Sequence, residues 1–84
     1  MRYEQLQELL ERKPFIPFRF FTSDGNVHII RDPNTVYLTR ATMEVAKPIR
    51  RNNRFAFYVQ LIDPIHIVRA QFLDQEAVAE RPDN

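Results

Sequence analysis

The chain has 84 residues, of which 44% are hydrophobic and 27% charged, with a formal net charge of +1 and no cysteine. This length allows one domain, and the near-average composition favours neither a disordered nor a membrane-spanning class. Two histidines without clustered carboxylates are too few ligands for a structural zinc site, and no disulfide can form. Because so short a domain buries only about 60–65% of its unfolded surface, we expect self-association to complete the core.

The sequence has no signal for a membrane or for secretion. Its apolar runs stay well below the roughly 18 to 20 residues of a membrane span. The opening MRYEQLQELLERK is charged throughout, unlike the apolar region of a secretory signal. We therefore expect a cytoplasmic protein, which agrees with the absence of cysteine.

Residues 2–12 are predicted to form an amphipathic helix. Tyr3, Leu6, Leu9 and Leu10 recur at helical spacing, with glutamates between them. The helix must end near Lys13, because Pro14 disfavours the helical conformation of the residue before it. A helix of about eleven residues is marginal alone in water, so its leucines are expected to cover the segment that follows.

An Asp24-Gly25 pair lies between two runs rich in aromatic and β-branched residues, FIPFRFFTS and NVHIIR. Such a pair reaches the positive φ angles of a tight primed turn, so the sequence predicts a β-hairpin. Strand alternation then places these side chains on its core face: Phe18, Phe20, Thr22, Val27 and Ile29. The opposite face, which a strongly curled sheet or a partner chain would cover, carries Arg19, Phe21, His28 and Ile30.

Turn signals divide the remaining chain into short strands. They stand at Asp32-Pro33, at Arg40 to Thr42, in the basic segment 47–54 and at Asp63-Pro64. The run FAFYVQLI, residues 55–62, is apolar almost throughout, which favours a central strand buried on both faces. Five or six strands and one helix predict a mainly β fold: a small, strongly bent antiparallel barrel with an N-terminal helix, forming one domain over 1–73.

Two segments differ from the rest in charge. Residues 74–84 have a net charge of −3 and are predicted to form a frayed helix or a loose acidic tail. The segment KPIRRNNR, residues 47–54, has four positive charges in eight residues and is predicted to be a loop. Its cations are candidate nucleic-acid contacts: Lys47, Arg50, Arg51 and Arg54. Arg19 and Arg31 are lesser candidates.

Two interpretations of this basic segment stand side by side. Arginine binds phosphate in bidentate fashion, and the adjoining Phe55, Phe57 and Tyr58 could stack on bases. Alternatively, the charges only solubilise a long loop and the aromatic residues belong to the core. A ring of subunits would gather many such charges on one face and strengthen the first interpretation.

The stretch KPFIPFRFFTSDGNVHIIRDP resembles the opening of a group of short uncharacterised bacterial proteins with a Pro-Phe-x-Pro-Phe-Arg segment followed by Asp-Gly. The order of elements, ending in LIDPIHIVRAQF, is similar to the Sm-like barrel, a small barrel of the SH3-like kind, in bacterial host-factor RNA chaperones. This resemblance implies an oligomer built by strand addition between subunits, and nucleic-acid binding. The chain departs from the chaperones where their turn has a Lys-His pair, since it has Asp63-Pro64 and then Ile65-His66.

Groups for catalysis are few. Ser23 and the aspartates beside Gly or Pro are explained as turn formers, and His28 and His66 as structural or surface residues. Gly25 is the single glycine, so no glycine-rich phosphate loop exists. We therefore expect no cofactor, no metal and no enzymatic activity, but a homo-oligomeric binding or assembly module, whose further partner the sequence does not identify. The alternative is an RNA- or DNA-binding protein.

Overall fold

The computed structural model describes residues 1–52 and 54–73, apart from the side chains of Arg50, Arg51 and Phe55. Within these residues the elements are α1 (Tyr3–Glu11), β1 (Phe18–Thr22), β2 (Val27–Ile30), η1 (Pro33–Thr35), β3 (Val36–Leu38), β4 (Met43–Arg51), β5 (Arg54–Ile62), η2 (Pro64–His66) and β6 (Ile67–Phe72). The acidic segment 74–84 lies outside the described residues.

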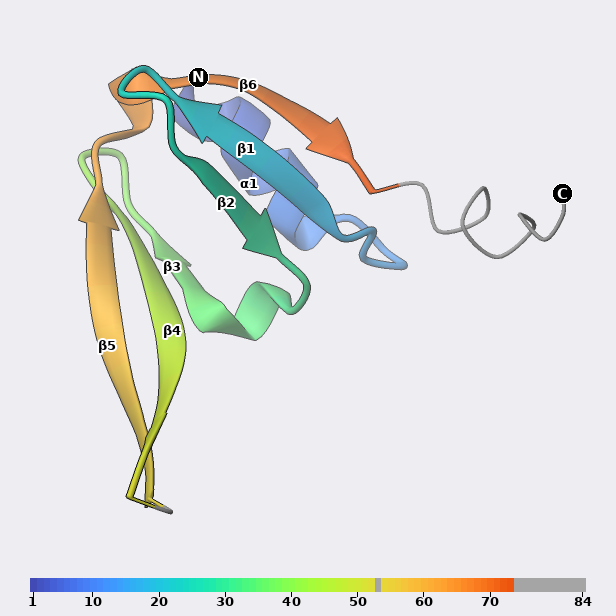
Figure 1. Cartoon of the computed structure of the whole chain (residues 1–84). Helices are drawn as coiled ribbons and strands as arrows, with labels where there is room; N and C mark the ends of the chain where they lie inside the picture. Colours follow the sequence, from blue (N-terminus) through green and yellow to red (C-terminus); the bar gives the residue numbers. More distant parts are fainter. Residues whose placement is uncertain (53, 74–84) are drawn as a thin grey trace, which may run out of the picture.

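The strands form two antiparallel sheets, which we call sheet A, in the order β2-β1-β6, and sheet B, in the order β3-β4-β5. Helix α1 lies behind sheet A, and the far end of the β4–β5 hairpin projects from the body (Figure 1). The prediction of a mainly β fold with an N-terminal helix is therefore confirmed. The ladders of the described residues form these two separate sheets and do not close a barrel.

The chain passes between the sheets at the two Asp-Pro turns that the sequence predicts. The Asp32 carboxylate accepts a hydrogen bond from the Asn34 amide (2.9 Å), and the Asp63 carboxylate accepts one from the Ile65 amide (3.1 Å). Each aspartate thus caps a short 3-10 helix that begins with proline, whose missing N–H is not needed there. The two turns thus have the same local structure, and one leads into β3 and the other into β6.

The core lies between α1 and the inner faces of both sheets. Its buried side chains are Leu6, Phe18, Phe20, Ile30, Met43, Val45, Ile62 and Ile67. Helix α1 spans Tyr3–Glu11, close to the predicted 2–12, and its leucines pack into this core. Arg40, in the turn between β3 and β4, holds the helix from outside, since its guanidinium pairs with Glu4 (3.1 Å) and lies over the Tyr3 ring.

The β1–β2 hairpin is present, but the predicted core face of β2 is wrong. The Thr22 amide donates to the Asn26 carbonyl (3.0 Å), which continues the ladder by one pair and leaves a three-residue loop, residues 23–25. Within it the Gly25 amide donates to the Thr22 carbonyl (2.9 Å), with Gly25 at φ +91°. One extra loop residue moves every β2 side chain to the other face. His28 and Ile30 are therefore buried, whereas Val27 and Ile29 are 49% and 44% exposed.

Strand β6 returns to sheet A and pairs with β1, from Phe18 opposite Phe72 to Thr22 opposite Ile67. An irregularity between Phe21 and Thr22 shifts the register there. Ile67 is buried, whereas Ile65 and Val68 are exposed, because Ile65 belongs to η2 and Val68 lies at the irregularity. This pairing joins the first and last strands of the described chain.

The run 55–62 is a strand, but the prediction that it is central and buried on both faces is wrong. Strand β5 pairs only with β4 among the described residues, so it is the edge of sheet B. Ile62 is buried at the base of the hairpin, whereas Phe57, Tyr58, Val59 and Leu61 are exposed. The apolar run therefore supplies a surface as well as part of the core.

Candidate functional site

The outward face of sheet B is apolar along β5. Successive outward positions of this strand are occupied by Phe57, Val59 and Leu61, and Leu61 is 67% exposed. The neighbouring outward positions of β4 hold Pro48, Ala46 and Glu44, and Tyr37 follows on β3. A stripe of apolar side chains thus borders an open strand edge, a combination that marks sites of association.

The two open edges of the β4–β5 hairpin differ. Strand β3 covers only Met43, Glu44 and Val45, so β4 from Ala46 to Arg51 has a second edge with no partner strand in the described residues. That edge contains Lys47, Pro48 and two arginines, which natural proteins use to block strand addition. Strand β5 has no lysine, proline or acidic residue, and its single charge is Arg54 at the start. Of these two edges of the hairpin, the β5 edge is therefore the one without blocking residues.

The basic segment 47–54 is not the loop that the sequence predicts. It forms the end of β4, a turn with Asn52 at φ 52°, and the start of β5. Arg50 and Arg51 pair with Phe55 and Arg54 in the ladder, but their side chains are not described. The ladder between β4 and β5 includes this segment, so Lys47 and Arg54 lie on paired strands of the hairpin and not in a loop.

The four predicted nucleic-acid contacts are only partly brought together. The exposed Arg54 is paired with Arg51 next to the turn. Lys47 lies four residues before Arg51, about 13 Å along the strand, opposite Tyr58. The pKa of His28 is lowered by burial and, to a smaller extent, by the Lys47 charge.

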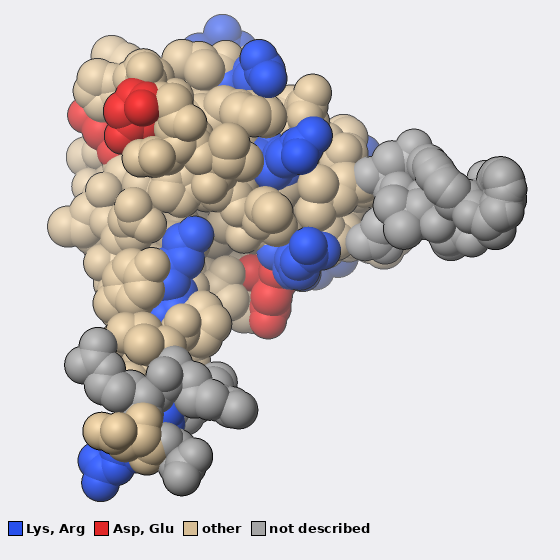
Figure 2. All heavy atoms as spheres, viewed as in Figure 1, with Lys and Arg blue, Asp and Glu red and all other residues tan. Residues whose placement is uncertain are grey.

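A second basic surface lies on the outward face of sheet A. The Arg69 and Arg19 guanidiniums lie 4.0 Å and 5.7 Å from the centroid of the Phe21 ring, and Arg19 Nε donates to Gln71 Oε1 (3.0 Å). Figure 2 shows basic side chains spread over this face and down the hairpin, with the acidic ones gathered chiefly near the β1–β2 turn. Arg19 is among the predicted lesser candidates, but Arg69 is not. Strict alternation from the buried Ile67 would place Arg69 on the core face, and the irregularity at Val68 turns it outward.

A polar cluster lies where the β1–β2 turn meets η2. Ser23 Oγ and His66 Nδ1 are 3.2 Å apart, and the Ser23 amide donates to the His66 carbonyl (2.8 Å). The Asp24 carboxylate accepts from Thr22 and Asn26, which lowers its pKa, and the Asp63 carboxylate accepts from the Ile65 amide. Both carboxylates thus serve the turns, so the cluster has the contacts of a structural junction.

His28 is the one polar ring in the core of the described chain. It is 6% exposed and stacks on Phe20 with a centroid separation of 4.9 Å, and its Nδ1 has no hydrogen-bond partner in the described residues. Burial lowers the pKa of His28, and the Lys47 charge lowers it further. Both effects favour the neutral imidazole, which suits a packing role.

The described residues contain no group of three or more His, Asp or Glu side chains placed to hold a metal ion. They also contain no helix that is both long and apolar enough to span a bilayer. No family model, curated protein or solved structure matches this chain. Function must therefore be inferred from its own strand edges and surfaces.

Proposed function

We propose that this protein is a non-enzymatic assembly module whose copies join through β5. The observation that carries the proposal is the contrast between the two edges of one hairpin: the β4 edge is blocked by charge and proline, and the β5 edge is not. An unblocked edge of nine residues next to an exposed apolar stripe has both parts of a strand-addition site, main-chain groups for affinity and side chains for specificity.

A second copy fits this edge by antiparallel pairing. If the two-fold axis passes through Tyr58, Phe57 of one copy stands opposite Val59 of the other, and the apolar stripes merge across the new ladder. Arg54 then stands opposite Ile62 of the other copy, so the two arginines lie about 27 Å apart, well beyond the screening length of about 8–10 Å. The pair forms one continuous sheet of six strands without a clash of like charges.

Burial supports such a pair energetically. Full burial of a large aliphatic or aromatic side chain contributes roughly 1.5–3 kcal/mol, and each copy offers Phe57, Val59 and Leu61. The resemblance to Sm-like barrels also implies strand addition between subunits, although there the last strand provides one edge. An assembly through β5 and β6 of successive copies is thus the second arrangement to test.

The test is the solution mass of matched variants, measured by light scattering on a sizing column. At micromolar concentration the wild type should have about twice the 10.1 kDa mass of one chain. Val59→Lys should give a monomer, because lysine blocks an edge strand. Val27→Lys, an equally exposed valine on β2, is the matched control and should leave the mass unchanged.

Val68→Lys on β6 separates the two arrangements. If β5 pairs with β5, this variant stays a dimer. If β5 pairs with β6, it becomes a monomer like Val59→Lys. A wild type that is monomeric at all accessible concentrations, or one that Val59→Lys leaves associated, would contradict the proposal.

A further inference from the structure

The outward face of sheet A has a regular arrangement of side chains, set by the pairing of its strands. One row across the sheet holds Ile29, Arg19 and Gln71, and the next holds Val27, Phe21 and Arg69. We call these six residues the outward grid. Its rows are separated by about 6.8 Å and its columns by about 4.8 Å. The central column, Arg19 and Phe21 on β1, thus lies between an apolar column on β2 and a polar column on β6.

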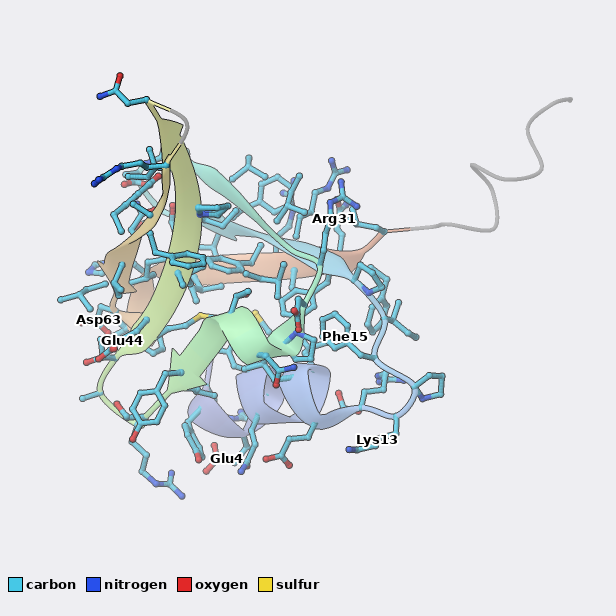
Figure 3. The ribbon with its side chains drawn as sticks, turned by 90° about the horizontal axis from the view of Figure 1, so that it is seen from below. Glu4, Lys13, Phe15, Arg31, Glu44 and Asp63 are labelled. Carbon is cyan, nitrogen blue, oxygen red and sulfur yellow. The ribbon has the colours of Figure 1, made fainter. Side chains whose placement is uncertain are left out.

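The cations of the outward grid have no carboxylate partner among residues 1–52 and 54–73. Both ion pairs found in the described residues, Arg12 with Glu8 and Arg40 with Glu4, involve helix α1. Neither involves Arg19 or Arg69, nor Arg31, which follows the apolar column two residues after Ile29. Figure 3 shows Arg31 on the opposite side of the molecule from Glu4 and Lys13. Within the described part of the chain, the ion pairs therefore lie on the helical side, and the arginines of sheet A are in no ion pair.

The two arginines of the outward grid are held in place. Arg69 stacks against Phe21, and Arg19 is fixed both by the same ring and by its hydrogen bond to Gln71. An ordered guanidinium loses less entropy when it binds phosphate, and its exposed plane also stacks on a base. Flexible lysines that only improve solubility would need no such supports.

We infer that the outward grid binds single-stranded nucleic acid. Phosphates pair with Arg19, Arg69 and Arg31, and bases lie over Val27, Ile29 and the Arg69–Phe21 stack. A single strand fits better than a duplex, because a duplex shows its base edges only in grooves, whereas a flat apolar column contacts bases that are already unstacked. This surface is separate from β5, so binding and assembly are independent properties.

Three double variants, each removing two positive charges, locate the binding surface. Arg19→Gln with Arg69→Gln changes the outward grid, Lys47→Gln with Arg54→Gln changes the hairpin, and Arg2→Gln with Lys13→Gln changes the helical side as the control. Anisotropy of a labelled oligonucleotide of about twelve bases measures affinity. The grid variant should bind at least about tenfold more weakly than the wild type, with the salt slope reduced by about 1.4, and the other two should stay within about threefold.

Phe21→Leu tests the base contact separately. It should weaken binding of the oligonucleotide more than binding of heparin, a polyanion without bases, because heparin loses only the ordering of the two arginines whereas the oligonucleotide also loses the base contact. Melting curves and sizing of every variant confirm that fold and assembly are intact. Three results would overturn the inference: a wild type that does not bind the oligonucleotide, equal losses in all three double variants, or heparin and an acidic peptide binding as tightly as the oligonucleotide.

Discussion

The two ends of the β4–β5 hairpin have similar residue types in very different surroundings. At the base, Met43 and Ile62 stand opposite each other and are buried under sheet A and α1. Farther along the same face of β5, Tyr58 and Ala56 are exposed. An apolar strand therefore indicates burial only where another layer is present, and elsewhere it provides a surface for association.

The largest effect expected from the difference between buried and exposed apolar residues comes from replacing leucine with alanine at one site of each kind. Leu6→Ala empties a site that is 0% exposed and should lower the free energy of unfolding by about 2–5 kcal/mol. Leu61→Ala changes a side chain that is 67% exposed and should cost less than about 0.5 kcal/mol in the monomer.

Urea denaturation at low protein concentration measures both values. At higher concentration, the Leu61 variant should lose the extra stability that assembly gives the wild type, because assembly stabilises only the folded chain. Equal losses at the two leucines would show that the outward face of β5 is buried in the monomer.

The turns at the ends of the two hairpins give the next effect in size. Gly25→Ala should destabilise the protein by about 1–2 kcal/mol, because its φ of +91° disfavours any residue with a Cβ. No atom lies within 4 Å of the new Cβ, so the backbone conformation alone is responsible.

Asn52 also has a positive φ, but its turn lies at the projecting end of the hairpin. Asn52→Gly should shift the melting temperature by less than Gly25→Ala does, because asparagine already tolerates this conformation. A larger effect at Asn52 would contradict the view that stability depends chiefly on the packed body.

The smallest effect is a pH dependence of stability arising from His28. Its pKa lies below the ordinary value of 6.5 because burial and the Lys47 charge disfavour the imidazolium, only partly offset by Asp24. The unfolded chain therefore binds the proton more readily, so stability is complete above pH 6.5 and falls as the pH drops below it.

Melting temperatures measured between pH 8 and pH 5 test this dependence, since each kcal/mol lost from the free energy of unfolding lowers the melting temperature by roughly 4–8 °C. His28→Leu should flatten the profile, whereas His66→Gln, a change on the exposed surface, should preserve its slope. A profile that persists in His28→Leu would assign the effect to another group.

Local signals predict the fold well wherever a single residue type decides the backbone. Pro14 limits the helix, and Asp32 and Asp63 cap the two proline-led turns at the corners between the sheets. Longer-range features have no such signal. The pairing of β1 with β6 joins segments about fifty residues apart, and the sequence IVRAQF does not indicate with which strand it pairs.

The errors have physical causes of the same kind. Asp24-Gly25 suits two hairpin loops that differ by one residue, and that residue decides whether His28 or Ile29 is buried. The β5 run is compatible with a central strand buried on both faces and with an exposed edge strand that associates with a partner, because both can have an almost continuous apolar sequence. Arg69 was missed because only the sheet shows that it shares the ring of Phe21 with Arg19.

The placement of η1 and η2 has a consequence for chain length. Residues 36–62 leave sheet A at one corner and return at the other, while β4 and β5 stay paired residue for residue from Met43–Ile62 to Arg51–Arg54. Removing or adding two residues in each strand preserves the alternation and shifts the tip by about 7 Å, whereas a one-residue change inverts it. Evolution or design can therefore change the length of the β4–β5 hairpin in steps of two residues per strand without altering the packed body.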